Sequence, residues 1–426
     1  CLGTVGKIME SIDFDFDTPI DRTGTACEKW DGRERKFGRA DVIPLWVADM
    51  DFAAPPCVQT ALAARIAHPV FGYSYPRDNF YQALYGWFTR RHGWQINPAQ
   101  VLLTPGVVPS LFAAVQALTE PGDAVLVPTP VYPPFFSAVE TSGRRLVQSP
   151  LLHTGQGYRL DFDHLEREAA KGAKMLLLCS PHNPVGRVWQ AAELQALIEL
   201  ALRHRLVIVS DEIHCDLVYP EQRHWPLARL APPELRLLTA LSPSKTFNMP
   251  GLNLSALVVA QETDRKAVAR VFDRVHVNPF NPLTLVAAEA AHAQGDAWLD
   301  ALLDYLAGNR QQVMAFLAQE SRLICQPPEA TCLMWLDCHP LKLSNTALRD
   351  FFVQKAGLGL NEGSSFGLGG DGFMRLNIGT NRALLDRALV QLGAALAEGR
   401  SEKGWISNVM LREVAASKQT LRLRAG

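Results

Sequence analysis

Polar and glycine-containing loops follow four apolar runs of the chain. These loops are residues 104–108 (TPGVV), 180–186 (SPHNPVG), 210–212 (SDE) and 242–245 (SPSK). In open α/β folds, ligands bind beyond the carboxyl ends of the parallel strands, so loops in this position surround one crevice. We therefore expect the four loops to form a single ligand site.

Three side chains in these loops suit an aldehyde cofactor that carries a phosphate group and a basic ring nitrogen. Lys245 stands in a Ser/Pro turn, where a partly desolvated amine can form an imine. Asp211 ends an apolar run and can keep the ring nitrogen protonated, which lets the ring accept electrons. Asn183 can donate a hydrogen bond to a ring hydroxyl. These residues predict a site for a cofactor of this kind.

The start of a predicted helix over 107–118 supplies an anion-binding element. Its first backbone N–H groups have no partner within the helix and favour a phosphate. The residues that present them are Gly106, Val107 and Val108. Ser242 and Ser244 can add hydroxyl donors from another strand end. The phosphate is therefore expected between these two loops.

Other short patterns point to different chemistry, and their surroundings disfavour it. Residues 367–372 match G-x-G-x-x-G, but a predicted strand follows this motif, whereas a dinucleotide site needs the strand before it. Residues 363–367 match the G-x-S-x-G nucleophile motif, but glycines follow where a helix is needed. Asp211, His214 and Asp216 suggest a metal site, yet no further ligand cluster accompanies them.

The elements that carry these loops alternate between apolar strands and amphipathic helices. Strands are predicted at 101–103, 124–127, 173–179, 205–210, 236–241 and 254–260. Helices are predicted at 107–118, 132–142 and 191–204. Apolar strands joined by helical crossovers are typical of a largely parallel sheet with helices on both faces.

The pattern changes beyond residue 283. Residues 283–320 have helical periodicity, and a smaller α+β segment follows them. In this segment strands are predicted at 331–336 and 373–378, and helices at 346–355 and 382–396. The fold class is therefore α/β, with a large domain and a smaller α+β domain.

Composition narrows the function classes. The chain has 426 residues, of which 48% are hydrophobic and 20% charged, so it can bury a large core. Its net charge of -1 argues against a nucleic-acid binder, and its apolar runs are too short for a membrane span. The eight cysteines are scattered without a Cys-x-x-Cys pair, which favours reduced, mostly buried thiols and a cytoplasmic location.

Several motifs resemble those of a known family. Residues 180–186, 210–214 and 242–248 resemble pyridoxal-phosphate enzymes of fold type I in the class I/II aminotransferase superfamily. Residues 44–52 (PLWVADMDF) and 71–75 (FGYSY) look like the MalY/PatB branch of cysteine-S-conjugate β-lyases, or cystathionine β-lyases. Residues 373–379 (FMRLNIG) fit as well, and the resemblance covers about residues 15–396.

The resemblance implies a domain organisation. We expect an N-terminal segment (9–55) that joins the small domain, a large cofactor-binding domain (56–294), a C-terminal small domain (295–399) and a poorly ordered tail (400–426). Met9 is the expected start of the native chain.

The resemblance also implies roles around the cofactor, pyridoxal 5'-phosphate. Lys245 would carry the imine and later move the proton of the substrate Cα. Asp211 would pair with the ring nitrogen, and Asn183 would bond the ring hydroxyl. His214 would lie near that hydroxyl, or else be a packed strand-end histidine. Tyr132 would stack on the ring.

Further residues are implied on the substrate side. Arg375 would bind the substrate carboxylate through paired hydrogen bonds. Trp46 and Ala48 would line the substrate, mainly through their backbone. Tyr73 would reach the site of a neighbouring subunit and touch phosphate or substrate, so the resemblance implies a homodimer with shared active sites.

The implied reaction is α,β-elimination. L-cystathionine and other cysteine S-conjugates would release a thiol, pyruvate and ammonia. One alternative is an aminotransferase that uses the same site with a 2-oxo acid. Another is a regulatory protein that binds a transcription factor, since a member of the resembled branch has such a side role.

Overall fold

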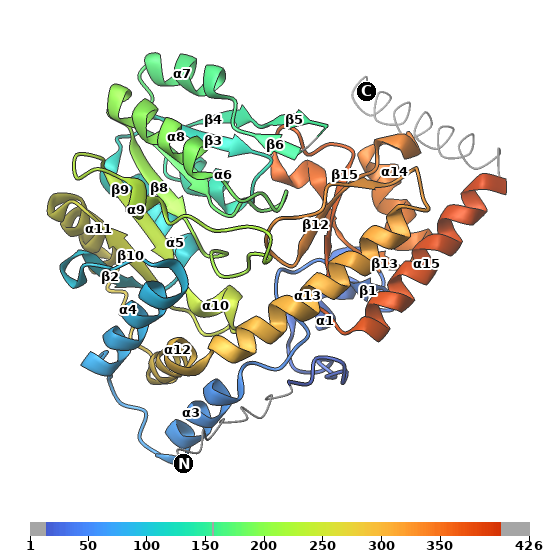
Figure 1. Cartoon of the computed structure of the whole chain (residues 1–426), viewed down its shortest axis with the longest axis horizontal. Coiled ribbons are helices and arrows are strands. Elements are labelled where there is room, and N and C mark those ends of the chain that lie inside the picture. Colours follow the sequence, from blue (N-terminus) through green and yellow to red (C-terminus); the bar gives the residue numbers. More distant parts are fainter. Residues whose placement is uncertain (1–13, 156, 402–426) are drawn as a thin grey trace, which may run out of the picture.

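A seven-stranded sheet forms the larger half of the fold (Figure 1). The computed structural model describes residues 14–155 and 157–401. The strands lie in the spatial order β2-β10-β9-β8-β7-β3-β4. Their bounds are β2 (Val101–Thr104), β3 (Ala124–Thr129), β4 (Arg145–Pro150), β7 (Met175–Cys179), β8 (Val207–Asp211), β9 (Leu237–Leu241) and β10 (Ser255–Val259).

The sheet is mostly parallel, as the alternating pattern predicts. Strands β4, β3, β7, β8 and β9 pair in parallel, whereas β10 is antiparallel to both β9 and β2. This single antiparallel strand is compatible with the largely parallel sheet that the pattern predicts. An apolar run has the same composition in either direction, so strand direction is decided by the connection that precedes it.

Both faces of this sheet are buried, which explains the continuous apolar runs. In β7, Met175, Leu177 and Cys179 pack with one cluster, and Leu176 and Leu178 pack with another. This alternation is the two-residue period of a strand covered on both sides. The first cluster includes residues of α5 (Val107–Leu118), α6 (Pro134–Glu140) and α11 (Glu262–Arg274), and the second includes α7 (Phe162–Ala170), α8 (Ala191–His204) and α9 (Leu227–Leu230).

The helices agree closely with the sequence patterns in this part of the chain. Helices α5 and α8 have the predicted bounds. The helical stretch after residue 283 is divided into α12 (Pro282–Gln294) and α13 (Asp296–Leu317). Gly295 lies between them. A side chain does not fit at this position, because a Cβ would lie 2.3 Å from the Phe247 ring. Helices α3 (Pro56–Ala67) and α4 (Asp78–His92) pack on α12.

A four-stranded antiparallel sheet forms the second part of the fold, in the order β11-β12-β15-β14. Its strands are β11 (Ile324–Cys325), β12 (Leu333–Asp337), β14 (Asn361–Glu362) and β15 (Phe373–Asn377). Helix α14 (Asn345–Asp350) continues into a π-helical turn over Phe351–Lys355. Figure 1 shows α13 running from α12 to this sheet, with α15 (Arg382–Ser401) beside it.

The N-terminal segment packs on this second part. Strand β1 (Ile43–Pro44) pairs in parallel with β13 (Leu358–Gly359). Two short helices precede it, α1 (Glu28–Asp31) and α2 (Arg33–Phe37). Residues 9–13 of the expected N-terminal segment and 402–426 of the expected tail lie outside the described residues.

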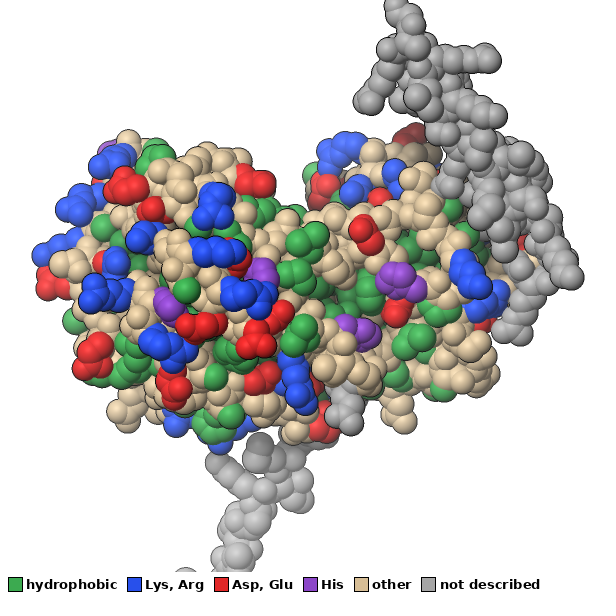
Figure 2. All heavy atoms as spheres, turned by 90° about the horizontal axis from the view of Figure 1, so that it is seen from above, with side chains coloured by type: hydrophobic (Ala, Val, Ile, Leu, Met, Phe, Trp, Pro, Cys, Tyr) green, Lys and Arg blue, Asp and Glu red, His purple; other side chains and the backbone are tan. Residues whose placement is uncertain are grey.

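Smaller elements and the surface complete the description. A hairpin joins β5 (Leu152–Thr154) to β6 (Gly157–Arg159), and α10 (Pro243–Thr246) follows β9. All seven cysteines of the described chain are free, and five are buried. No helix within residues 14–155 or 157–401 is both long and apolar enough to cross a bilayer. On the face seen in Figure 2, acidic and basic side chains are interspersed.

Candidate active site

A cavity of about 660 Å³ lies beyond the carboxyl ends of β7, β8 and β9, beside the 46–48 backbone and Arg375 of β15. This volume is in the range of small-molecule and cofactor sites. Almost every predicted site residue lines it: Trp46, Ala48, Gly106, Val107, Val108, Tyr132, Asn183, Asp211, His214, Ser242, Ser244, Lys245 and Arg375. Segments far apart in sequence therefore meet here, as the strand-end pattern predicts.

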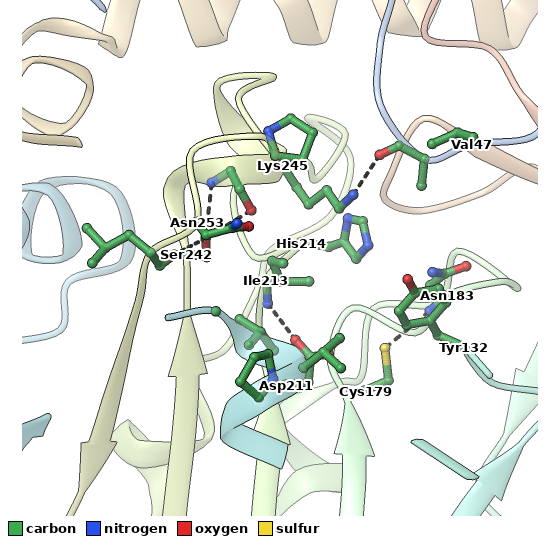
Figure 3. Close-up of a pocket in the computed structure, with 18 of the residues that line it drawn as sticks. Val47, Tyr132, Cys179, Asn183, Asp211, Ile213, His214, Ser242, Lys245 and Asn253 are labelled. Atoms are coloured by element: carbon green, nitrogen blue, oxygen red, sulfur yellow. Dashed lines mark hydrogen bonds between the residues drawn. The ribbon is translucent and has the colours of Figure 1, made fainter. Parts of the chain in front are cut away.

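Lys245 lies in α10, directly after β9. Ser242 caps this short helix by accepting a hydrogen bond from the Ser244 N–H at 3.2 Å. The Lys245 Nζ donates to the Ala48 carbonyl at 2.8 Å, and Figure 3 shows the side chain reaching across the cavity toward residues 47–48. Burial lowers the pKa of Lys245. A lowered pKa favours the neutral, nucleophilic amine that imine formation needs.

Asp211 is the last residue of β8 and is buried. Its Oδ1 accepts one hydrogen bond, from the Ile213 N–H at 3.1 Å. Burial raises the pKa of Asp211 from 3.8 to about 7, although the positive charge of Lys245 acts in the opposite direction. A buried carboxylate of this kind is stabilised by a cation in the cavity, such as a protonated ring nitrogen.

His214 and Asn183 lie on the cavity wall near Lys245 and Tyr132 (Figure 3). The Nδ1 of His214 is buried and has no hydrogen-bond partner among the described residues. Burial, together with Lys245 and Arg375, lowers the pKa of His214 to about 3, so its ring is neutral. Burial also raises the pKa of Tyr132, which stays protonated.

The start of α5 is open for an anion. The N–H groups of residues 106–108 have no acceptor within the helix, because they belong to its first turn. No side chain caps this helix start. Ser242 also lines the cavity, and its hydroxyl donates to the Leu254 carbonyl at 2.7 Å. The Ser242 hydroxyl can donate a hydrogen bond to a phosphate only if it breaks its hydrogen bond to the Leu254 carbonyl.

Arg375 of β15 is a buried guanidinium without a carboxylate partner in the described parts of the chain. Its Nη1 donates to Asn183 Oδ1 at 3.1 Å. Its Nη2 donates to the Trp46 carbonyl at 2.8 Å and to Asn361 Oδ1 at 3.0 Å. Its Nε has no hydrogen-bond partner in the part of the chain that the structure describes, and burial lowers the pKa of Arg375 to about 10. Such a cation fits an incoming carboxylate.

Some residues of the site were not among those predicted. Asn361 holds the Arg375 guanidinium, and Asn253 and Cys179 line the cavity. An asparagine beside a glycine-rich turn has no local pattern that distinguishes it, so Asn361 is recognised only once β14 pairs with β15.

Tyr73 is the one predicted site residue that does not line this cavity, and its side chain is fully exposed. Its predicted place is the site of a second subunit. Asp216 also lies elsewhere: its carboxylate accepts hydrogen bonds from Trp87, Thr246 and His92. Asp216 therefore does not line the cavity with Asp211 and His214.

These groups fit pyridoxal 5'-phosphate on their own geometry. Among the described residues, the Asp211 carboxylate has no ion-pair partner, no side chain caps the start of α5, and His214 Nδ1 has no hydrogen-bond partner. All three face the cavity into which Lys245 extends its amine. The donor set thus matches a ring cation, a phosphate and an aldehyde.

Comparisons with known proteins agree with this geometry. Residues 40–392 match the family model described as aminotransferase class I and II. The chain is 40% identical over 385 residues to cystathionine beta-lyase PatB of Bacillus subtilis (strain 168), which covers 90% of this chain and 100% of that protein. It is 36% identical over 383 residues to protein MalY of Escherichia coli (strain K12), covering 89% and 98%. The solved structure of cystalysin from Treponema denticola, which contains a pyridoxal 5'-phosphate cofactor, matches with a TM-score of 0.87 at 34% identity, covering 91% of this chain and 100% of that one.

Proposed function

Because the chain belongs to the aminotransferase class I and II family, we propose that it is a pyridoxal-phosphate-dependent carbon–sulfur β-lyase. Its substrates are L-cystathionine and other cysteine S-conjugates, which yield a thiol, pyruvate and ammonia. The carrying observation is the cavity that combines the Lys245 amine, the Asp211 carboxylate and the unpaired Arg375 guanidinium. Relatives named as cystathionine β-lyases support the reaction type.

Pyridoxal 5'-phosphate supplies an electron sink that stabilises negative charge at the substrate Cα. The residues that would hold it are Asp211 at the ring nitrogen, Asn183 at the ring hydroxyl, Tyr132 on the ring face, and residues 106–108 with Ser244 at the phosphate. His214 is neutral, so it can accept or donate a hydrogen bond near the ring. Lys245 takes the proton from the substrate Cα, because its buried amine has a lowered pKa.

Arg375 binds and orients the substrate carboxylate. Its guanidinium is fixed by Asn183, Asn361 and the Trp46 carbonyl, so it loses little freedom when a substrate binds. Residues 46–48 also line the cavity.

An elimination assay tests the reaction type. Full-length protein with its cofactor should convert L-cystathionine to pyruvate and ammonia in equal amounts without an added oxo acid. If product forms only when a 2-oxo acid is supplied, the protein is an aminotransferase and not a lyase. Aminotransferase is also the activity after which the family is named.

A trapping experiment tests the assignment of the lysine. Borohydride reduction should attach the cofactor to the peptide that contains Lys245, and Lys245→Ala should lose elimination while it keeps its fold. Cofactor recovered on any other lysine would refute the assignment.

We further propose a homodimer with shared active sites. The segment 70–75 projects exposed apolar side chains, including Phe71, Tyr73 and Tyr75, which a second copy would cover. Mixed Lys245→Ala and Tyr73→Phe subunits should form hybrids with one intact site each. Activity should then rise above that of either parent, and no recovery after verified subunit exchange would contradict the shared site.

We also propose a division into domains and a cytoplasmic location. The β1–β13 pairing supports placing residues 9–55 with the small domain at 295–399 and apart from the large domain at 56–294. The free cysteines of the described chain support a cytoplasmic location.

A further inference from the structure

Residues 46–52 (WVADMDF) form a segment without helix or strand, here called the strap, that touches both charged ends of the site. The Ala48 carbonyl accepts the hydrogen bond from Lys245 Nζ at 2.8 Å. The Trp46 carbonyl accepts one from Arg375 Nη2 at 2.8 Å. The backbone of the strap therefore orients the amine and the guanidinium together.

Asn377 holds the strap from the strand that carries Arg375. It is fully buried in β15, and its Nδ2 donates to the carbonyls of Val47 at 2.6 Å and Asp49 at 2.7 Å. Its Oδ1 accepts from the Gly379 N–H at 2.7 Å, so every polar atom of its side chain is used. The two carbonyls that it binds flank Ala48, whose carbonyl contacts Lys245.

Asn248 holds the other end of the strap from the loop that carries Lys245. Its Oδ1 accepts from the Met50 N–H at 2.8 Å. Its Nδ2 donates to the carbonyls of Met50 at 2.9 Å and Phe52 at 2.7 Å. Its backbone has a φ of 51°, in the left-handed region that asparagine tolerates better than most residues.

We propose that Asn377 and Asn248 are positioning residues that clamp the strap, so that its carbonyls align the Lys245 amine with the Arg375 guanidinium. Neither asparagine lines the cavity, so each acts through the strap. The proposal rests on the roles given above to Lys245 and Arg375. Asn377 lies in β15 with Arg375, and Asn248 lies shortly after α10, which carries Lys245. The strap thus connects the two parts of the site.

Substitutions at the clamps should lower turnover in a coupled way. Asn377→Leu keeps the approximate size of the side chain and removes its hydrogen bonds, and Asn248→Gly keeps the left-handed backbone while it removes the amide. Each should reduce kcat roughly ten- to hundred-fold, the effect of a displaced catalytic group. Because both hold one strap, the double variant should be no worse than the more severe single variant. Effects that multiply would refute a shared clamp.

Asn309 provides a matched control. It is also fully buried and donates from Nδ2 to two carbonyls, those of Ile378 at 2.9 Å and Thr380 at 2.8 Å. Within the described residues its side chain makes no hydrogen bond to the strap, which meets this turn through the Asp51 N–H that donates to the Gly379 carbonyl at 2.8 Å. Asn309→Leu should lower the melting temperature and leave kcat and KM nearly unchanged. A loss of kcat equal to that of Asn377→Leu would mean that general destabilisation, and not the strap, explains the effect.

A readout apart from turnover tests the position of the lysine itself. The full chain, freed of cofactor, takes up pyridoxal 5'-phosphate through Lys245 at a rate that rises as the amine deprotonates. Losing the Ala48 acceptor destabilises the charged amine, so the midpoint of this pH–rate profile should move to lower pH in both clamp variants. Asp49, Asp211, Arg375 and Cys332 act on the pKa of Lys245, and His214 is coupled to the same amine; all five are unchanged in these variants.

The outcomes separate this proposal from the lyase assignment. If the clamp variants keep the wild-type profile and kcat while borohydride still labels Lys245, only the clamp is refuted. If Lys245 is not labelled, the assignment of the lysine fails first. Should Asn377→Leu not fold, Asn248→Gly decides the question alone, because Asn248 is partly exposed.

Discussion

Asp211 and Asp216 lie at the two ends of one short segment, and both are buried, yet their environments are opposite. Asp211 accepts a single backbone hydrogen bond, and burial raises its pKa to about 7. Burial also acts on Asp216, but hydrogen bonds from His92, Thr246 and Trp87 outweigh it and lower its pKa to about 2. Burial alone therefore does not decide the direction in which the pKa of a carboxylate moves, whereas the number of hydrogen-bond donors around it does.

The same contrast extends to the neighbours of the two carboxylates. Arg375 and His214 surround the cavity with polar atoms that lack partners among the described residues. Glu212, by contrast, is fully buried behind the site and accepts hydrogen bonds from Ser210, His224 and the Leu227 N–H. The hydrogen bonds of Glu212 therefore fix the end of β8. The polar atoms of Arg375 and His214 face the cavity, where a cofactor and a substrate can bind them.

The largest expected effect is at Asp211. Asp211→Asn keeps the shape of the side chain and removes the charge that stabilises a cationic ring. Turnover of L-cystathionine should fall roughly hundred- to thousand-fold, which is the usual loss when one preorganised electrostatic group is removed. Steady-state kinetics at saturating cofactor measures it, and a loss below about tenfold would place the electron-sink partner elsewhere.

The matched change at Asp216 should affect stability instead of chemistry. Asp216→Asn removes the charge that His92, Thr246 and Trp87 contact, and charged hydrogen bonds contribute about 1.5–3 kcal/mol. The free energy of unfolding should fall by about 2–3 kcal/mol in calorimetry or denaturant titration. If kcat falls as far as in Asp211→Asn, the contrast between the two carboxylates is wrong.

Arg375→Lys sharpens the contrast on the substrate side. Lysine keeps the charge but loses the planar fork that binds a carboxylate through two hydrogen bonds. We expect kcat/KM for L-cystathionine to fall roughly ten- to hundred-fold, from losing bonds of about 1.5–3 kcal/mol. The visible absorbance of the cofactor should not change. Normal turnover would show that the carboxylate binds elsewhere.

The smallest expected effect is a pH dependence of the cofactor-free chain. The folded pKa of Asp211 is raised above 3.8 to about 7, so its contribution to stability is present below pH 4 and lost as pH rises through 7. Asparagine does not ionise, so the melting temperature of Asp211→Asn relative to wild type should increase between these pH values. The difference in unfolding free energy changes by at most about 1.4 kcal/mol per pH unit. A constant difference would contradict the raised pKa.

The lysine side of the site was predictable because its signals are local. Helices α5 and α8 match their predicted bounds, and Lys245 and Asp211 follow apolar runs that become β9 and β8. Strand and helix periodicity, and the turn residues that end each element, act over about a dozen neighbouring residues. Such patterns are visible in the order of amino acids before any long-range contact forms.

The substrate side depended on the family motifs and, for its contacts, on the tertiary structure. Arg375 was expected from its motif, but its burial without a carboxylate and its bond to Asn361 arise from the pairing of β14 and β15. The strap reaches Arg375 and Lys245 only because the N-terminal segment folds back onto β13 and β15. The antiparallel direction of β10 likewise had no local signal.

The amino-acid sequence by itself therefore determined which residues could do the chemistry and which strand ends would carry them. Only the tertiary structure decided which buried charges have partners, because a partner can come from any distance along the chain. Asp211 ends β8 and Asp216 follows the same strand, and neither local propensity nor hydrophobic pattern distinguishes their carboxylates. The helix that brings His92 and Trp87 to Asp216, and the cavity that leaves Asp211 open, make the difference.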